Sequence, residues 1–162
     1  MAIYMEYEGL KGNVTATGYV GMIQLDFFAF EIHRKISMKT GELANRESSK
    51  PACCVLVTGK RMDGASVGMF REAVSGCTGK QVKLHFVRTG KTQLQEYLTY
   101  TFKQCLPVFF STLDTRSEES APVETLYLSY SAVEVSFTDS GADNQTLNIQ
   151  RHGYDLAKAE SL

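Results

Sequence analysis

The segment "PVETLYLSYSAVEVSF", from Pro122 to Phe137, changes its apolar face partway along its length. Its large apolar side chains alternate at Leu126, Leu128 and Tyr130 and then, one residue out of step, at Val133, Val135 and Phe137. Alternation with a period of two is typical of a strand with one buried face. A strand that exchanges its buried face needs a bend or bulge of the kind that turns corners in barrels. Alternatively, both faces are covered, the second by another subunit.

The segment "MIQLDFFAFEIHRKI", residues 22–36, repeats this change of face. Its apolar positions are first Ile23, Leu25 and Phe27 and then Phe28, Phe30 and Ile32. Other segments keep one apolar face and predict half-buried strands. Their apolar sets are Ile3, Met5 and Tyr7; Val82, Leu84 and Phe86; Leu98, Tyr100 and Phe102; and Leu147 and Ile149. Pro107 lacks an N–H donor, which places it at a strand edge or a bulge.

One helix is predicted over "DGASVGMFREAVSG", residues 63–76. Asp63 or Ser66 can cap its start, and Gly76 suits its C-terminal cap. An apolar stripe follows the helical period at Val67, Phe70 and Val74. Many strands and one helix favour a mainly β fold, a two-sheet antiparallel β-barrel or sandwich with one flanking α-helix. A chain of 162 residues suits a single domain, residues 1–162.

The segment "ISMKTGELANRESSKP", Ile36 to Pro51, is too polar for a core element, since only Ile36, Met38 and Leu43 are large and apolar. Loops of this length are uncommon in compact domains and are usually functional or disordered. We therefore expect a long extended loop over residues 36–51. A second polar loop is expected over residues 113–122.

Composition excludes several classes of function. A formal charge of −1 favours neither nucleic acid nor an anionic membrane as a partner. No stretch is long and apolar enough for a membrane helix, and the start "MAIYMEYEGLKG" does not resemble a signal peptide. Synthesis and folding in the cytosol are expected. The four cysteines include no C-x-x-C pair, so free thiols are favoured over a disulfide framework.

No catalytic, cofactor-binding or metal-binding set is predicted. His33 and His85 fall on the expected outer faces of strands, His152 precedes a glycine in an expected turn, and none lies at ligand spacing from a cysteine. Cys53 or Cys54 could act as a nucleophile only with a base brought near by the fold. The steps "TGK" at Thr58, Thr78 and Thr89 lack the glycine spacing of a phosphate loop and are interpreted as hairpin turns with exposed lysines.

Four separated stretches of the sequence carry a resemblance to a known family. They are the opening "MAIYMEYEGLKGN" with the bent strand after it; the "TGEL…R…P" loop leading to "TGKRMDGAS" and the helix; "EYLTYTFKQCLPVFF" followed by "PVETLYLSYSAVEVSF"; and the close "GYDLAKA". In this order they resemble the haemolysin-coregulated protein family, which forms the inner tube of the bacterial type VI secretion system. Their order and spacing cover nearly the whole chain. The terminal motif comprises Gly153, Tyr154, Asp155 and Leu156, with tyrosine where many relatives carry tryptophan.

The resemblance implies a structural protein without enzymatic activity or cofactor. It implies hexameric rings that stack into a hollow tube, a contractile sheath around the tube, a spike of the valine-glycine repeat type, and effector proteins in the lumen. It also implies secretion without a signal peptide after a cytoplasmic stage, and no fused toxin domain. The long loop would lie on a neighbouring subunit, through the residues Met38, Lys39, Thr40, Gly41, Glu42, Leu43, Arg46 and Glu47.

Three alternatives stay open on the residues alone. A tail-tube protein of a contractile phage shares the architecture. A monomeric β-barrel that binds a small ligand would explain the strands but not the long loop. An enzyme with Cys53 or Cys54 as nucleophile would lose activity on substitution of that thiol by serine.

Overall fold

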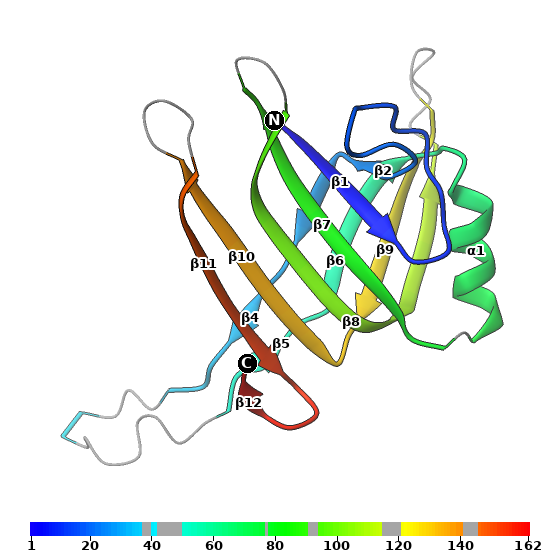
Figure 1. The fold of residues 1–162 in the computed structure, drawn as a ribbon. Coiled ribbons are helices and arrows are strands. Elements are labelled where there is room, and N and C mark those ends of the chain that lie inside the picture. Colours follow the sequence, from blue (N-terminus) through cyan, green and yellow to red (C-terminus); the bar gives the residue numbers. More distant parts are fainter. Residues whose placement is uncertain (37–39, 42–49, 77, 91–93, 115–120, 141–145) are drawn as a thin grey trace.

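Two antiparallel sheets, joined by one long bent strand, form the body of the protein (Figure 1). The computed structural model describes residues 1–36, 40–41, 50–76, 78–90, 94–114, 121–140 and 146–162. The strands are β1 (Ala2–Tyr7), β2 (Ile23–Leu25), β3 (Phe27–Ala29), β4 (Ile32–His33), β5 (Ala52–Cys53), β6 (Leu56–Arg61), β7 (Lys80–Thr89), β8 (Leu94–Leu113), β9 (Val123–Ser129), β10 (Ala132–Ser140), β11 (Thr146–Asp155) and β12 (Glu160–Ser161). The helix is α1 (Ser66–Ser75).

The strand pairings run from β2 through β1, β7, β8, β9 and β6 to β3, and the chain at Asp26 connects the two ends. The first sheet has the order β12-β11-β10-β8-β7-β1-β2, and β3, β6 and β9 complete the second by pairing β3 with β6, β6 with β9 and β9 with β8. Because β2 leads directly into β3, and β8 takes part in both sheets, the two sheets share two corners. The result is a barrel, from which β10, β11 and β12 extend one wall (Figure 1).

Both predicted changes of face are corners between the sheets. β2 pairs with β1 in the first sheet, and after Asp26 the chain continues as β3, which pairs with β6 in the second. Likewise β9 pairs with β6, and after Tyr130 and Ser131 the chain continues as β10, which pairs with β8. The interpretation of the phase shift as a bend is therefore confirmed.

The strand β8 makes its own corner near Pro107. Its first half pairs with β7 and β10, and its second half pairs with β9. The register with β9 shifts between Pro107 and Phe109, so of the two expected positions for a proline without an N–H donor, a strand edge or a bulge, the structure has the bulge.

Alternating side chains fill the barrel interior. The predicted inner residues of β1, β7 and β8 lie in one core, where Met5, Val82, Leu84 and Phe102 have no exposed surface. The rings of Phe28, Phe30, Tyr100 and Tyr130 pack against this core. Burial of this apolar surface is the main stabilising term of the fold.

Four predicted core positions are wrong. Ile32 and Phe137 are 53% and 42% exposed. Phe27 is 44% exposed, and its ring lies across Gly59 on the paired strand, where a Cβ would overlap it. Ile149 is 59% exposed because β11 belongs to the wall that extends beyond the barrel.

Among the described residues, no helix combines the length and apolar character needed to cross a bilayer.

Candidate assembly surfaces

A two-stranded ribbon, β4 with β5, carries the chain away from the barrel toward the predicted loop (Figure 1). It has two paired positions, Ile32 with Cys53 and His33 with Ala52. Ile32 and Ile36 are 53% and 50% exposed. An isolated two-stranded ribbon is at best marginally stable in water. The ribbon therefore presents apolar side chains to solvent on an element that its own barrel does not cover.

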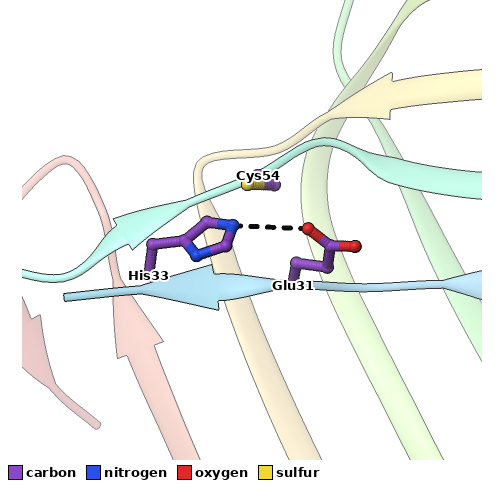
Figure 2. Close-up of side chains that lie close together, drawn as sticks. All are labelled: Glu31, His33 and Cys54. Atoms are coloured by element: carbon purple, nitrogen blue, oxygen red, sulfur yellow. Dashed lines mark hydrogen bonds and ion pairs between the residues drawn. The ribbon is translucent and has the colours of Figure 1, made fainter.

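Three side chains with metal-binding atoms meet at the root of this ribbon (Figure 2). Glu31 and His33 project from one strand, and Cys54 lies on the facing segment, where its N–H donates to the carbonyl of Glu31 at 3.0 Å. No ligand spacing in the sequence predicted this set, because strand pairing brings it together across the long loop.

Most of the predicted inter-subunit loop lies outside the described residues: Met38, Lys39, Glu42, Leu43, Arg46 and Glu47. Thr40 and Gly41 are described, form a turn and are exposed, and Gly41 has a φ of 87°. The structure also describes Ile36 and Lys50, which lie beyond the two strands of the ribbon.

The helix α1 turns its apolar stripe outward. Val67, Phe70 and Val74 are 80%, 56% and 66% exposed, whereas Ser66 and Met69 are its buried residues. The sequence pattern identified the stripe correctly. A stripe of this kind on a surface helix ordinarily faces the core, so its exposure marks a surface that a partner can cover.

The stripe continues onto the adjoining part of β8. A groove of about 260 Å³ lies between the two elements and is lined by Phe70, Ala73, Val74 and residues 107–110. Val108 and Phe109 are 55% and 48% exposed. We call Val67, Phe70, Val74, Val108 and Phe109 the α1–β8 apolar surface. It lies on the side of the barrel opposite the β4–β5 ribbon (Figure 1).

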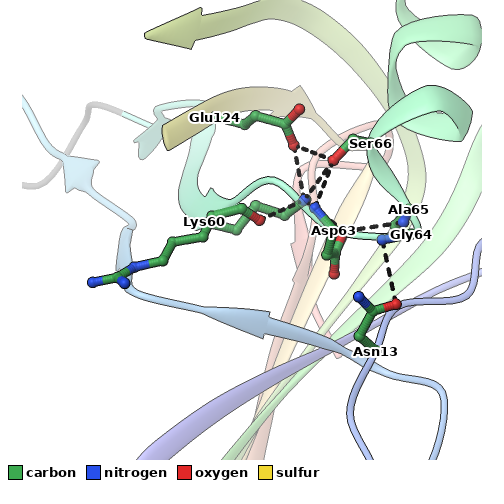
Figure 3. Close-up of polar contacts among 8 residues, drawn as sticks. Asn13, Lys60, Asp63, Gly64, Ala65, Ser66 and Glu124 are labelled. Carbon is green, nitrogen blue, oxygen red and sulfur yellow. Dashed lines mark hydrogen bonds and ion pairs between the residues drawn. The ribbon is translucent and has the colours of Figure 1, made fainter. Parts of the chain in front are cut away.

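A buried polar cluster fixes α1 to the barrel (Figure 3). Lys60 Nζ lies 2.8 Å from Glu124 Oε2 and donates to Asp63 Oδ1 at 2.7 Å and to Ser66 Oγ at 3.1 Å. Ser66 Oγ donates in turn to Glu124 Oε2 at 2.8 Å. The cluster sets the position of the helix, and so the direction in which its stripe points.

Two predictions at this cluster are corrected. The step at Thr58 to Lys60 is not a hairpin turn with an exposed lysine, because it lies inside β6 and Lys60 is 3% exposed. Neither Asp63 nor Ser66 is the N-cap residue, since Ala65 holds that position without a side-chain cap. Asp63 instead accepts the N–H of Ala65 at 3.0 Å. The predicted C-terminal cap, Gly76, is confirmed by its left-handed conformation.

The outer strand β11 leaves part of its edge without a described partner. It pairs along its length with β10, but on its other side the structure pairs only Tyr154 and Asp155 with β12. A strand edge with free N–H and C=O groups is a template for pairing with another chain.

The terminal motif closes the end of this wall. Leu156 N–H donates to the carbonyl of Ser131 at 2.8 Å, and Asp155 Oδ1 accepts the N–H of Lys158 at 3.0 Å. Tyr154 packs against the barrel core. Gly153 has little room, because a Cβ there would lie 3.0 Å from the carbonyl oxygen of Val133. These contacts give Gly153 to Leu156 a role in ordering the chain end.

Of the other two histidines, His85 differs from the surface residue that the sequence indicated, whereas His152 is exposed as expected. His85 is on the outer face of β7, but its side chain is only 13% exposed because Tyr19 covers it. Its Nδ1 lies 2.6 Å from Glu96 Oε2, and this hydrogen bond lowers the pKa of Glu96. His152 lies within β11 and is exposed, so the expected turn is wrong.

The thiols that the structure describes are free. Cys53, Cys54 and Cys105 form no disulfide, and burial raises the pKa of Cys105 to about 12. A thiol with so high a pKa carries almost no thiolate near neutral pH and is a poor nucleophile.

Solved structures share this fold over nearly the whole chain. One, titled "Structure of a type six secretion system protein", has a TM-score of 0.92 at 18% identity and covers 99% of each chain. Hcp1 from Salmonella typhimurium has a TM-score of 0.79 at 24% identity, covering 99% of this chain and 98% of its own. Hcp3 from Pseudomonas aeruginosa has a TM-score of 0.65 at 14% identity, covering 94% and 98%. These similarities define the class of fold as that of the type VI secretion barrels.

The sequence assigns the family. The family model described as "Type VI secretion system effector, Hcp" matches residues 4–137, and the chain belongs to this family. It is accordingly a structural, non-enzymatic component of the type VI secretion tube, which confirms the resemblance drawn from the four sequence stretches. No curated protein sequence is significantly similar to the chain.

Proposed function

We propose that this chain is the subunit of a type VI secretion inner tube that forms hexameric rings, and that the rings stack into a hollow tube able to hold effector proteins. In this proposal residues 1–162 act as one unit, and residues 36–51 form an arm that lies on a neighbouring copy. The sheath and the valine-glycine repeat spike are its partners in the machine. It is made in the cytoplasm and leaves the cell through the system without a signal peptide.

The observation that carries the proposal is the β4–β5 ribbon. It has only two paired positions, and Ile32 on the ribbon and Ile36 just beyond its end are exposed, so the ribbon is poorly stabilised by the barrel from which it projects. Ordering the backbone of the arm costs on the order of 1–2 kcal/mol for each residue. A neighbouring copy offers the surface against which that cost is recovered.

The position of the other surfaces supports a ring. The ribbon and the α1–β8 apolar surface lie on opposite sides of the barrel (Figure 1). A contact between copies that joins two different surfaces is heterologous, and such contacts close into rings when the rotation between copies allows it. The edge of β11 adds a further place where a second copy can pair.

The ligand-binding alternative gains no support from the barrel interior. The space that a ligand would occupy holds the side chains of buried residues, among them Met5, Ile23 and Phe102 with no exposed surface. Interiors packed in this way have few voids larger than a water molecule. A cavity of about 810 Å³ lies outside the barrel wall instead, between residues 16–19 and His85.

Deletion of Thr40 to Ser49 tests the role of the arm. The full chain should elute as rings in size exclusion with light scattering, and the deletion variant should elute as a monomer with the same β-sheet circular dichroism. A matched control replaces Thr40 to Ser49 by a glycine-serine segment of equal length. This control should also be monomeric if the side chains of the arm make the contact. Rings formed by the deletion variant would show that the arm does not close the ring.

A further inference from the structure

We propose that Glu31, His33 and Cys54 form a zinc-binding site at the root of the β4–β5 ribbon. The inference concerns the chain itself and does not depend on the assembly proposed above. It rests on the pairing of two segments that the long loop separates in the sequence, and on the chemistry of the three side chains (Figure 2).

Strand geometry holds the three side chains together. Ile32 pairs with Cys53, so the next position toward the barrel sets Glu31 opposite Cys54. The hydrogen bond of 3.0 Å from Cys54 N–H to the carbonyl of Glu31 fixes this register. Glu31 and His33 are two residues apart on one extended segment, so their side chains share a face.

The distances between the donor atoms suit a single small cation. His33 Nε2 lies 3.3 Å from Glu31 Oε2, and the three ligand atoms all lie within 4.8 Å of one another. Ligands at zinc distances in a tetrahedral site are separated by about 3.4 Å for nitrogen and oxygen and by about 3.6 Å where sulfur is included. The histidine and glutamate already fit, and Cys54 Sγ lies within 4.8 Å of both, so ligation requires the thiol to move closer to them.

The donor set selects the metal. A thiolate, an imidazole and a carboxylate together suit Zn²⁺, whereas Mg²⁺ and Ca²⁺ prefer oxygen ligands alone. The charges of one thiolate and one carboxylate cancel the two positive charges of the ion. The side chains of His33 and Glu31 are 68% and 66% exposed, so an ion can reach them from solvent and keep a water in its fourth position.

The neighbouring thiol provides a matched control. Cys53 precedes Cys54 and interacts with the hydroxyl of Tyr130 on the barrel side. Tyr130 OH also donates to the carbonyl oxygen of Cys54 at 2.8 Å, which holds this segment against the barrel while Cys54 takes part in the exposed cluster. Two adjacent thiols thus have different surroundings, and only one belongs to the proposed site.

Zinc at this position would join both strands of the ribbon where the arm begins. A ligand that binds the folded ribbon and not the open one stabilises it by mass action. Occupancy should therefore slow amide hydrogen exchange at the root of the arm, over residues 31–36 and 50–54. This readout is separate from ring formation.

The test uses the full-length, metal-free protein under reducing conditions, titrated with Co²⁺ and then with Zn²⁺. We expect one Co²⁺ per chain, with the thiolate charge-transfer absorption and the visible bands of a tetrahedral site, both lost when Zn²⁺ is added. Cys54→Ser should abolish the charge-transfer band, and His33→Ala and Glu31→Gln should each weaken binding at least tenfold. Cys53→Ser and His152→Ala should bind like the parent chain.

The proposal is overturned if the band persists in Cys54→Ser, if it disappears in Cys53→Ser, or if Co²⁺ gives no charge-transfer band at all. The substituted side chains lie on or beside an exposed ribbon, so the variants are expected to keep the circular dichroism of the parent. Amide hydrogen exchange of the unsubstituted protein, measured with and without zinc, is a second and independent test of the site. Zinc must slow exchange at residues 31–36 and 50–54, and unchanged exchange there would also overturn the proposal.

Discussion

Lys60 Nζ lies 2.8 Å from Glu124 Oε2, and the two side chains are 3% and 2% exposed. They face each other directly in the register of β6 and β9. The same lysine reaches Ser66, the first residue of α1. A buried ion pair thus connects the second sheet to the start of the helix whose apolar stripe faces outward.

Lys60→Met should lower the free energy of unfolding by about 3–5 kcal/mol, because it leaves the carboxylate of Glu124 buried without its cation. Urea denaturation of the two proteins measures the difference. The matched control is Lys83→Met, which breaks an exposed pair with Glu6 and should change stability by less than about 1 kcal/mol. Equal effects of the two substitutions would contradict the role assigned to the buried pair.

Met69→Ala should destabilise the fold by about 2–5 kcal/mol, because Met69 is the apolar residue that α1 buries in the core. Val67→Ala, on the exposed stripe, should change the stability of the isolated chain by less than about 0.5 kcal/mol. Chemical denaturation of dilute protein compares the two. A larger loss for Val67→Ala would mean that the stripe packs within its own chain.

The hydrogen bond from His85 is the largest effect on the pKa of Glu96 and lowers it. Burial is the second largest effect and raises the pKa, but the net shift is downward. In acid, Glu96 therefore binds protons more readily in the unfolded chain than in the folded one. The stability that ionised Glu96 contributes is fully present above its ordinary pKa of 4.5 and is lost as the pH falls through its lower pKa in the folded protein. Glu96→Gln should lose stability relative to the parent near neutral pH and approach it in acid. Urea midpoints measured from about pH 7 down to about pH 3 test this. A difference that grows in acid would contradict the sign.

Cys105 should resist alkylation in the folded protein, because burial raises the pKa of its thiol to about 12 and leaves it without exposed surface. Iodoacetamide treatment followed by peptide mass spectrometry should find Cys105 unmodified in native conditions and fully modified in guanidinium chloride. Cys53 and Cys54 are partly exposed and serve as internal references. Rapid native modification of Cys105 would show that the core opens locally.

Sequence patterns were sufficient to predict a local feature of the fold where one physical constraint determines that feature. The shift of apolar phase after Tyr130 predicted a corner because a strand cannot change its buried face without one. The missing N–H of Pro107 predicted a strand edge or a bulge for an equally local reason, and the structure has the bulge. The order of the four stretches that resemble the family also predicted the protein class that the family match confirms.

The same patterns failed where the answer depends on distant partners. Val67, Phe70 and Val74 have helical spacing whether the stripe meets a core or faces solvent. Lys60 resembles an exposed turn lysine until strand pairing sets Glu124 opposite it. His33 and Cys54 have no recognisable ligand spacing, since the ribbon that joins them forms only in the folded chain.

The most direct test of the account is the mass of the purified full-length chain, measured by light scattering across a wide range of concentrations, with negative-stain images of the same sample. The account predicts ring-shaped particles of six times the 18.0 kDa mass of the chain. A folded species of 18.0 kDa at every concentration, without rings, would contradict it.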